Sequence, residues 1–114
     1  MKISPNFSRK EMACKCGCGF DTVDIELIGI LELIRSKIGA YSPSSVCRCI
    51  QHNFDIGGRS TSQHLVARAA DILHEDPKKL YDFIDYRFPD KYGLGLYQWG
   101  IHIDTRQGKA RWSH

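Results

Sequence analysis

Apolar residues recur at helical spacing between residues 22 and 38, in the segment TVDIELIGILELIRSKI. One face of a helix over this segment would carry Leu27, Leu31, Ile34 and Ile38. Gly39 follows directly and is a typical residue for ending a helix. The pattern therefore predicts a long amphipathic helix over residues 22–38.

Two other segments carry helix-start signals. In EDPKKLYDFIDYRF, Asp76 can cap the first turn, Pro77 takes the first helical position, and Pro89 lies just beyond the end. In FSRKEM, Ser8 precedes Glu11 by three positions, which is the spacing of a capping box. We therefore expect a second long helix and a short one near the N-terminus.

Alternating or short apolar runs predict strands in the second half of the chain. ARAADI indicates a buried strand, LGLYQWGIHIDTR indicates two short strands hinged at Gly100, and KARW and VCRC indicate further short strands. The glycine-containing segments CKCGCGFD and NFDIGGRSTSQ are expected to be loops. The predicted fold class is α+β, with a small antiparallel sheet flanked by helices in a single domain over residues 1–114.

Composition excludes few functions. The 114 residues are 42% hydrophobic and 25% charged, with a net charge of +3 and no run of Lys and Arg, so we do not expect nucleic-acid binding. No apolar run approaches the ~20 residues of a membrane span. The start, MKISPNFSRKEM, has no secretory signal. We therefore expect a monomer without a membrane span that is cytoplasmic as made.

The cysteines are odd in number: Cys14, Cys16, Cys18, Cys47 and Cys49. An odd count argues against a closed disulfide framework. CKCGCG and CRC could instead converge on a structural zinc with four thiolates, although C-x-C is tighter than the usual C-x2-C spacing. Reduced or partly paired thiols are the favoured alternative, and the zinc cluster stays open.

The segment SQHLVARAAD contains a candidate metal site. Zinc ligands hold their donor atoms roughly 3.3 Å apart, whereas seven residues of straight helix would separate the Cα atoms of His64 and Asp71 by ~10.5 Å. The two can share an ion only if SQHLVA is a turn that leads into a strand. In that strand Ala69 would lie on the same face as Asp71 and leave room beside it.

GIHIDTR offers further polar side chains. His102 and Asp104 alternate with two isoleucines, so both polar groups would face one side of a strand. Taken singly, each residue is more often a half-buried histidine or a capping carboxylate. Together, two histidines and a carboxylate, with water in the fourth position, match a known catalytic zinc arrangement.

These motifs resemble those of the M15 family of zinc peptidases. The family signature S-x-H-x-x-G-x-A-x-D is matched by Ser62, His64, Ala69 and Asp71, with Ala67 at the glycine position. That replacement is harmless if the φ angle of Ala67 is negative and strained if it is positive. The branch with short domains has a later H-x-D strand followed by arginine, which here is His102, Asp104 and Arg106.

Other segments agree with the resemblance over nearly the whole chain. FSRKEMACKCGCG resembles the start of the branch's domain, and KARW resembles its usual ending. CRCIQHN followed by IGG resembles S-G-x-R-x-x-x-H-N…G-G, which puts Arg48 at the family's arginine and Val46 at its glycine. The resemblance implies the M15 or hedgehog-like zinc peptidase fold.

The resemblance also implies a zinc held by His64, Asp71 and His102. The implied substrate is a peptidoglycan stem peptide or crosslink, cut next to a D-amino acid by carboxypeptidase or endopeptidase action. Such a protein would act on the cell wall after release, as a phage endolysin or virion-associated protein, or as a bacterial wall-remodelling enzyme. The alternative is a catalytically weak or inactive zinc-stabilised binding module of the same fold.

Roles for the remaining residues follow from the same resemblance. Some M15 enzymes place a glutamate base three residues before the last histidine ligand, where this chain has Trp99. Asp104 is the substitute candidate for the base, and its alternative role is to orient a ligand. Arg48 would stabilise an oxyanion or hold a substrate carboxylate. Ser62 and Gln63 would bind substrate, or cap the local turn.

Overall fold

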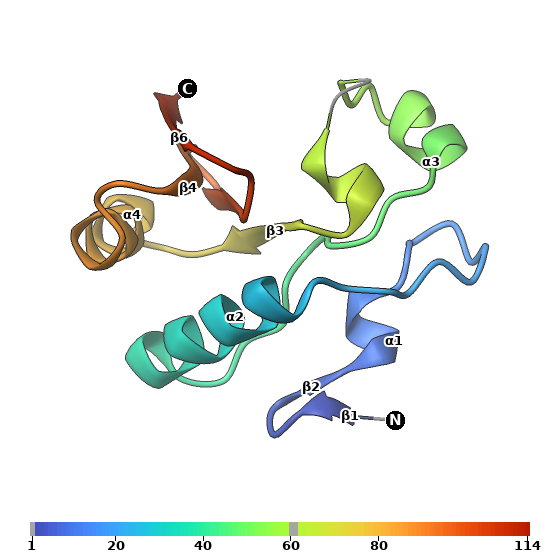
Figure 1. Cartoon of the computed structure of the whole chain (residues 1–114), viewed down its shortest axis with the longest axis horizontal. Coiled ribbons are helices and arrows are strands. Elements are labelled where there is room, and N and C mark those ends of the chain that lie inside the picture. Colours follow the sequence, from blue (N-terminus) through green and yellow to red (C-terminus); the bar gives the residue numbers. More distant parts are fainter. Residues whose placement is uncertain (1, 60–61) are drawn as a thin grey trace.

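The computed structural model describes residues 2–59 and 62–114, arranged as two small sheets and several helices (Figure 1). The elements are β1 (Lys2–Ser4), β2 (Phe7–Ser8), α1 (Arg9–Met12), α2 (Ile25–Ile38), α3 (Ile50–Asp55), the 3-10 turn η1 (Gln63–Val66), β3 (Ala69–Leu73), α4 (Pro77–Arg87), β4 (Tyr92–Leu96), β5 (Gly100–Asp104) and β6 (Lys109–Ser113). The α+β class is therefore confirmed. None of the helices in these ranges is long and apolar enough to cross a membrane.

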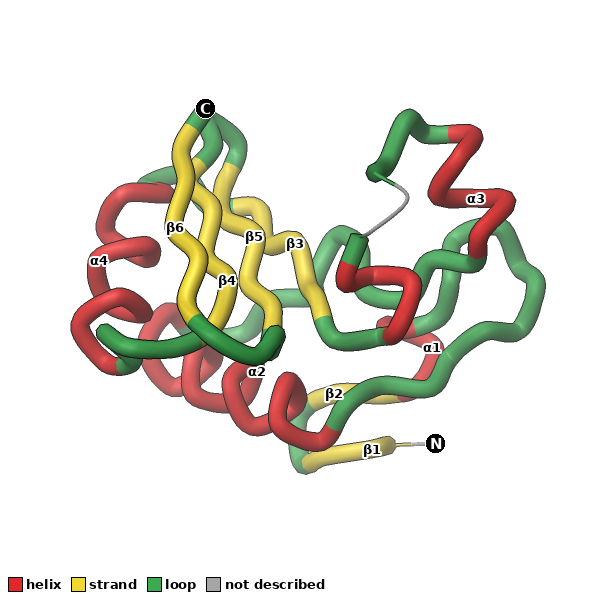
Figure 2. Tube along the Cα trace, turned by 45° about the horizontal axis from the view of Figure 1, so that its top comes forward, coloured by secondary structure: helices red, strands yellow, loops and turns green. Residues whose placement is uncertain are grey.

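The main sheet has the strand order β3-β5-β4-β6 (Figure 2). β5 pairs antiparallel with both β3 and β4, and a tight turn at Gly100 joins β4 to β5. The expectation of a purely antiparallel sheet is wrong at one edge, because β6 pairs parallel with β4. After β5 the chain crosses β4, and β6 pairs with the edge of β4 that faces away from β5. The local sequence pattern does not specify this pairing.

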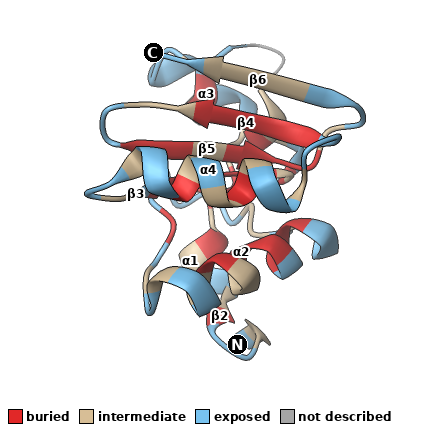
Figure 3. Cartoon of the chain, turned by 90° about the vertical axis from the view of Figure 1, so that its left-hand side faces the viewer, coloured by how far each residue is buried: buried red, intermediate tan, exposed pale blue. Residues whose placement is uncertain are grey.

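Alternation along the strands gives the sheet one apolar and one polar face. Ile72, Leu94 and Ile101 are fully buried in a core that also contains apolar residues of α2 and α4. Figure 3 shows β4 and β5 as largely buried strands, with α4 beside them and α2 between the sheet and the N-terminal hairpin. The opposite face carries the polar side chains of β3 and β5, so the site lies on the side of the sheet away from α2 and α4.

The predicted helix caps are largely confirmed. Ser8 and Glu11 form the capping box of α1, and Asp76 caps α4 with Pro77 in its first turn. Helix α2 begins at Ile25, three residues later than predicted, because the Asp24 side chain accepts a hydrogen bond from the backbone N–H of Leu27. Sequence periodicity located the helix, and the cap determined its first residue.

Two expectations for residues 46–58 are wrong. VCRC forms no strand, since the backbone N–H groups of Cys47 and Arg48 donate to Met12 and His64 rather than to one neighbouring strand. The segment NFDIGGRSTSQ is not entirely loop, because its first three residues complete helix α3. Residues 60 and 61 of that segment lie outside the described residues.

Candidate metal centre

The register between β3 and β5 brings two of the predicted ligands together. Asp71 lies directly opposite His102 in the antiparallel pair, so both side chains leave the same face of the sheet. His102 Nδ1 lies 3.0 Å from Asp71 Oδ1. Successive side chains of a strand point to opposite faces of the sheet. Because the isoleucines of β5 point into the core, His102 points to the other face, where it meets Asp71.

His64 reaches the same point from η1. Ser62 caps this turn, because its hydroxyl accepts a hydrogen bond from the backbone N–H of His64 at 3.2 Å. The buried imidazole places Nδ1 2.7 Å from the backbone carbonyl of Val46. A carbonyl can only accept, so Nδ1 carries a proton, and in the neutral imidazole Nε2 keeps its lone pair.

That lone pair faces another acceptor. His64 Nε2 lies 3.2 Å from Asp71 Oδ2, yet this buried nitrogen has no hydrogen-bond partner among the described residues. A neutral imidazole nitrogen and a carboxylate oxygen do not bond to each other, because neither supplies a proton. Their separation matches the roughly 3.3 Å between neighbouring ligands of a tetrahedral zinc. A cation would therefore satisfy an atom that the protein leaves without a partner.

His102 is oriented by a carboxylate behind it. Its Nε2 lies 2.8 Å from Asp104 Oδ2, and Asp104 also accepts bonds of 2.7 Å from Nε and Nη2 of Arg106. Burial by itself would raise the pKa of Asp104, but Arg106 and His102 hold it well below its usual range. This arrangement directs Nδ1 of His102 towards Asp71, as a carboxylate–histidine pair does in zinc sites.

The charges of the cluster are consistent with a cation at its centre. Burial alone would lower the pKa of His102, but Asp104 and Asp71 raise it above its usual range. Burial would raise the pKa of Asp71, whereas the hydrogen bond from His102 holds it well below normal. A proton on Nδ1 and a metal ion compete for the same lone pair, so metal binding would release that proton.

Arg48 forms the wall beside Asp71. Its Nη2 donates to Asp71 Oδ2 at 3.0 Å and its Nη1 donates to Asn53 Oδ1 at 3.1 Å. Asn53 is buried and donates in turn to the carbonyl of Arg59. A Cβ on Gly58 would lie only 2.1 Å from Asn53 Oδ1, so a side chain there would displace the amide that positions Arg48.

The three candidate ligands lie in a cleft of about 540 Å³. Its lining includes Arg48, Arg59, Ser62, Gln63, Tyr97, Trp99, Arg106, Trp112 and His114. The Trp112 ring packs 5.3 Å from His102 and donates to Tyr97 Oη, which in turn stacks on Trp99. Gly95 makes room for this wall, because a Cβ there would lie 2.3 Å from Trp112 Nε1.

The structure thus brings together most of the residues that the sequence singled out. His64, Asp71 and His102 converge, and Arg48 and Gln63 line the same cleft. Asp104 lies behind His102, is fully buried and is not part of the described lining.

The two departures from the family pattern behave differently. Ala67 ends η1 in the left-handed conformation, with φ 57°, which is the strained case. The side chain of Val46 is buried in the core rather than in the cleft.

Sequence reasoning missed Asn53 and the aromatic wall. The HN…GG segment contained the signal for Asn53 and Gly58, but spacing alone did not say that they position Arg48. The sequence singled out Trp112 only as part of KARW, which resembles the usual end of the family's domain. Its approach to His102 depends on the parallel pairing of β6 with β4, which sequence patterning had not predicted.

Two histidines and an aspartate converge in the cleft, with a carboxylate behind one histidine, and such a group could hold a metal ion. A family model described as peptidase M15 matches residues 5–104, and the chain belongs to this family of zinc metallopeptidases. No curated protein and no solved structure showed significant similarity to the chain.

Proposed function

We propose that this protein is a zinc-dependent peptidase that hydrolyses peptide bonds in peptidoglycan stem peptides or crosslinks, next to a D-amino acid. The observation that carries the proposal is the convergence of His64 Nε2, Asp71 and His102 Nδ1 in the cleft. Family membership and the resemblance of the motifs support the peptide substrate. The hedgehog-like arrangement of the fold is part of the same proposal.

His64, Asp71 and His102 would hold the zinc. Bound zinc supplies Lewis acidity, which polarises a carbonyl and lowers the pKa of a coordinated water. Each ligand has its own support: Val46 fixes the tautomer of His64, Arg48 holds Asp71, and Asp104 orients His102. Such support keeps ligands in place when substrate binds.

Asp104 fits the orienting role better than the role of general base. A base must reach the attacking water. Asp104 instead accepts from His102, Arg106 and the backbone N–H of Gly93, and it is fully buried. We therefore propose that Asp104 keeps the proton of His102 on Nε2.

Arg48 is the proposed catalytic cation. It lines the cleft next to Asp71 and is held by Asn53, so its guanidinium is fixed before substrate arrives. A preorganised cation at this point stabilises a developing oxyanion or binds a substrate carboxylate. Arg59 and Arg106 also line the cleft, where Asp71 is the one carboxylate among the described lining residues. Arg48 is paired with Asp71 and Arg106 with Asp104, so Arg59 is the lining cation that we propose for a carboxylate group of a wall peptide.

A catalytically inactive zinc-binding module is the second candidate. It is favoured by Trp99 at the position of the glutamate base and by the full engagement of Asp104. The two candidates differ in one experiment: purified peptidoglycan of several wall types is incubated with the zinc-loaded protein, with and without a chelator, and the products are analysed by mass spectrometry. Chelator-sensitive release of defined peptides supports the peptidase. Intact peptidoglycan from every wall type, with zinc bound, supports the binding module.

A further inference from the structure

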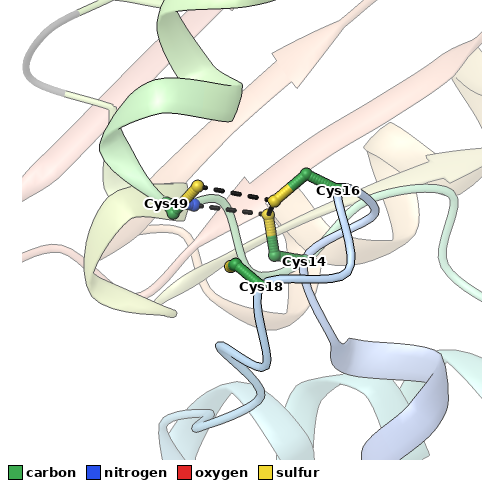
Figure 4. A group of neighbouring side chains, drawn as sticks. All are labelled: Cys14, Cys16, Cys18 and Cys49. Atoms are coloured by element: carbon green, nitrogen blue, oxygen red, sulfur yellow. Dashed lines mark hydrogen bonds between the residues drawn. The ribbon is translucent and has the colours of Figure 1, made fainter.

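Four of the five cysteines meet at a second point, on another part of the chain. Cys14, Cys16 and Cys18 come from the loop after α1, and Cys49 precedes helix α3 (Figure 4). The sulfur of Cys16 lies 3.5 Å from that of Cys14 and 3.6 Å from that of Cys49, and all four sulfurs lie within 4.8 Å of one another. Residues separated by more than thirty positions thus place four thiols together.

The spacing of the sulfurs matches a shared cation. Zinc–thiolate bonds of about 2.3 Å put neighbouring sulfurs of a tetrahedral site roughly 3.8 Å apart. A disulfide would require about 2.05 Å. None of the five cysteines is paired in the structure. Four soft sulfur donors with no histidine or carboxylate among them are the ligand set that selects zinc in structural sites.

The surrounding backbone supports negatively charged sulfurs. The backbone N–H of Cys49 donates to Cys14 Sγ, and that of His52 donates to Cys49 Sγ, both at 3.4 Å. Gly17 and Gly19 adopt φ values of 82° and 94°, which residues with a side chain rarely adopt. These glycines let the loop turn sharply enough for the tight C-x-C spacing to present three sulfurs to one point.

The fifth cysteine is accounted for separately. Cys47 is buried, its thiol donates to the carbonyl of Thr22 at 2.8 Å, and burial raises its pKa to about 12. It is therefore a neutral thiol in the core rather than a ligand. The odd number of cysteines in the sequence divides into four that cluster and one that does not.

We propose that Cys14, Cys16, Cys18 and Cys49 bind a structural zinc ion. All four coordination positions would be filled by the protein, so this site has no open position for water or substrate. Its role is to tie the loop at residues 14–18 to the start of α3. Cys49 follows Arg48 directly, and α3 contains Asn53, so the same zinc would steady the segment that positions the arginine of the cleft.

Zinc content and cobalt spectra test this proposal independently of hydrolysis. The protein is purified under reducing conditions with zinc, and metal is measured by mass spectrometry. We expect two zinc ions per chain, one in the double variant Cys16→Ser/Cys18→Ser, and two in the control Cys47→Ser, which keeps a donor for the Thr22 carbonyl. The cobalt-substituted protein should show a sulfur-to-cobalt charge-transfer band that the double variant loses and His64→Ala keeps.

X-ray absorption at the zinc edge of the wild type covers the case in which the double variant does not fold. The spectrum averages over both zinc ions. We expect a zinc–sulfur signal equal to four sulfur ligands for every two zinc ions, because one site has four thiolates and the other has none. The absence of zinc–sulfur scattering, an unchanged zinc count in a folded double variant, or a disulfide among the four cysteines in the reduced protein would overturn the proposal.

Discussion

The two clusters differ in donors, burial and support. The His64–Asp71–His102 cluster is held by the register of two neighbouring strands and a capped turn, and each of the three residues contacts a further residue that orients it. The four-cysteine cluster is held by a glycine-rich loop and the start of a short helix, and Cys16 and Cys18 are exposed. The first cluster opens into the cleft, whereas the second offers four like donors.

This difference in support corresponds to the difference between a catalytic and a structural metal site. A catalytic site needs ligands fixed independently of the ion, because one coordination position must stay available to water. A structural site can let the ion organise a loop that has little secondary structure of its own. Substitutions at the first cluster and its surroundings should therefore leave the zinc of the second cluster in place.

Replacing His64 with Ala should remove one zinc and almost all hydrolysis. The substitution deletes a buried side chain, proposed as a ligand, whose Nε2 has no hydrogen-bond partner among the described residues. Loss of the metal removes several kcal/mol of transition-state stabilisation, so we expect a fall in kcat/KM of at least about 10³-fold. Metal analysis should still find the zinc of the cysteine cluster. His74→Ala, at a half-buried histidine after β3, is the control and should keep both ions. Retention of two zinc ions by His64→Ala would remove His64 from the ligand set.

Replacing Arg48 with Ala should lower hydrolysis while both zinc ions remain. The guanidinium contacts Asp71 but is not itself a ligand. Removal of one preorganised oxyanion-stabilising group reduces kcat by about 10²–10³-fold. Steady-state kinetics and metal content on the same preparation measure both effects. Arg87→Ala, at an exposed position of α4, should match the wild type. A full loss of the site's zinc would show instead that the main role of Arg48 is to hold Asp71 for the metal, and not to stabilise an oxyanion.

Asp104→Asn distinguishes an orienting carboxylate from a general base. If Asp104 orients His102, zinc affinity at this site should fall by about 10–100-fold, and added zinc should restore much of the activity. Competition with a chelator measures the affinity. Asp90→Asn, at an exposed residue after α4, is the control. Unchanged zinc affinity with activity lost at saturating zinc would restore the role of Asp104 as the base.

The smallest effect is expected for Ala67→Gly. Relief of the left-handed strain favours glycine by roughly 1–2 kcal/mol. Loss of a buried methyl group, about 0.8 kcal/mol, and the greater freedom of glycine in the unfolded chain oppose it. The free energy of unfolding should therefore change by less than about 1 kcal/mol in denaturant titrations. Ala70→Gly has no positive φ to relieve and should be clearly more destabilising. Equal losses for both variants would contradict the strain at Ala67.

The candidate site was more predictable from the sequence than the sheet around it. His64, Asp71 and His102 could be identified because a turn, a strand and a two-residue alternation each follow from local pattern. The parallel partner of β6 could not, since pairing depends on contacts between distant segments.

Helix α3 was missed for a different physical reason. Its apolar residues Ile50 and Phe54 are 81% and 78% exposed, so the helix has no buried apolar face that a periodic pattern could reveal. The cysteine cluster was left open because the sequence shows spacing along the chain and not the approach of Cys49 to the loop.

The most direct test is a crystal of the zinc-loaded protein with anomalous diffraction recorded on both sides of the zinc absorption edge. We predict one anomalous peak within bonding distance, about 2.0–2.2 Å, of His64 Nε2, Asp71 and His102 Nδ1, with a coordination position facing the cleft. A zinc-loaded crystal in which these three side chains have no peak between them would contradict the proposed metal centre.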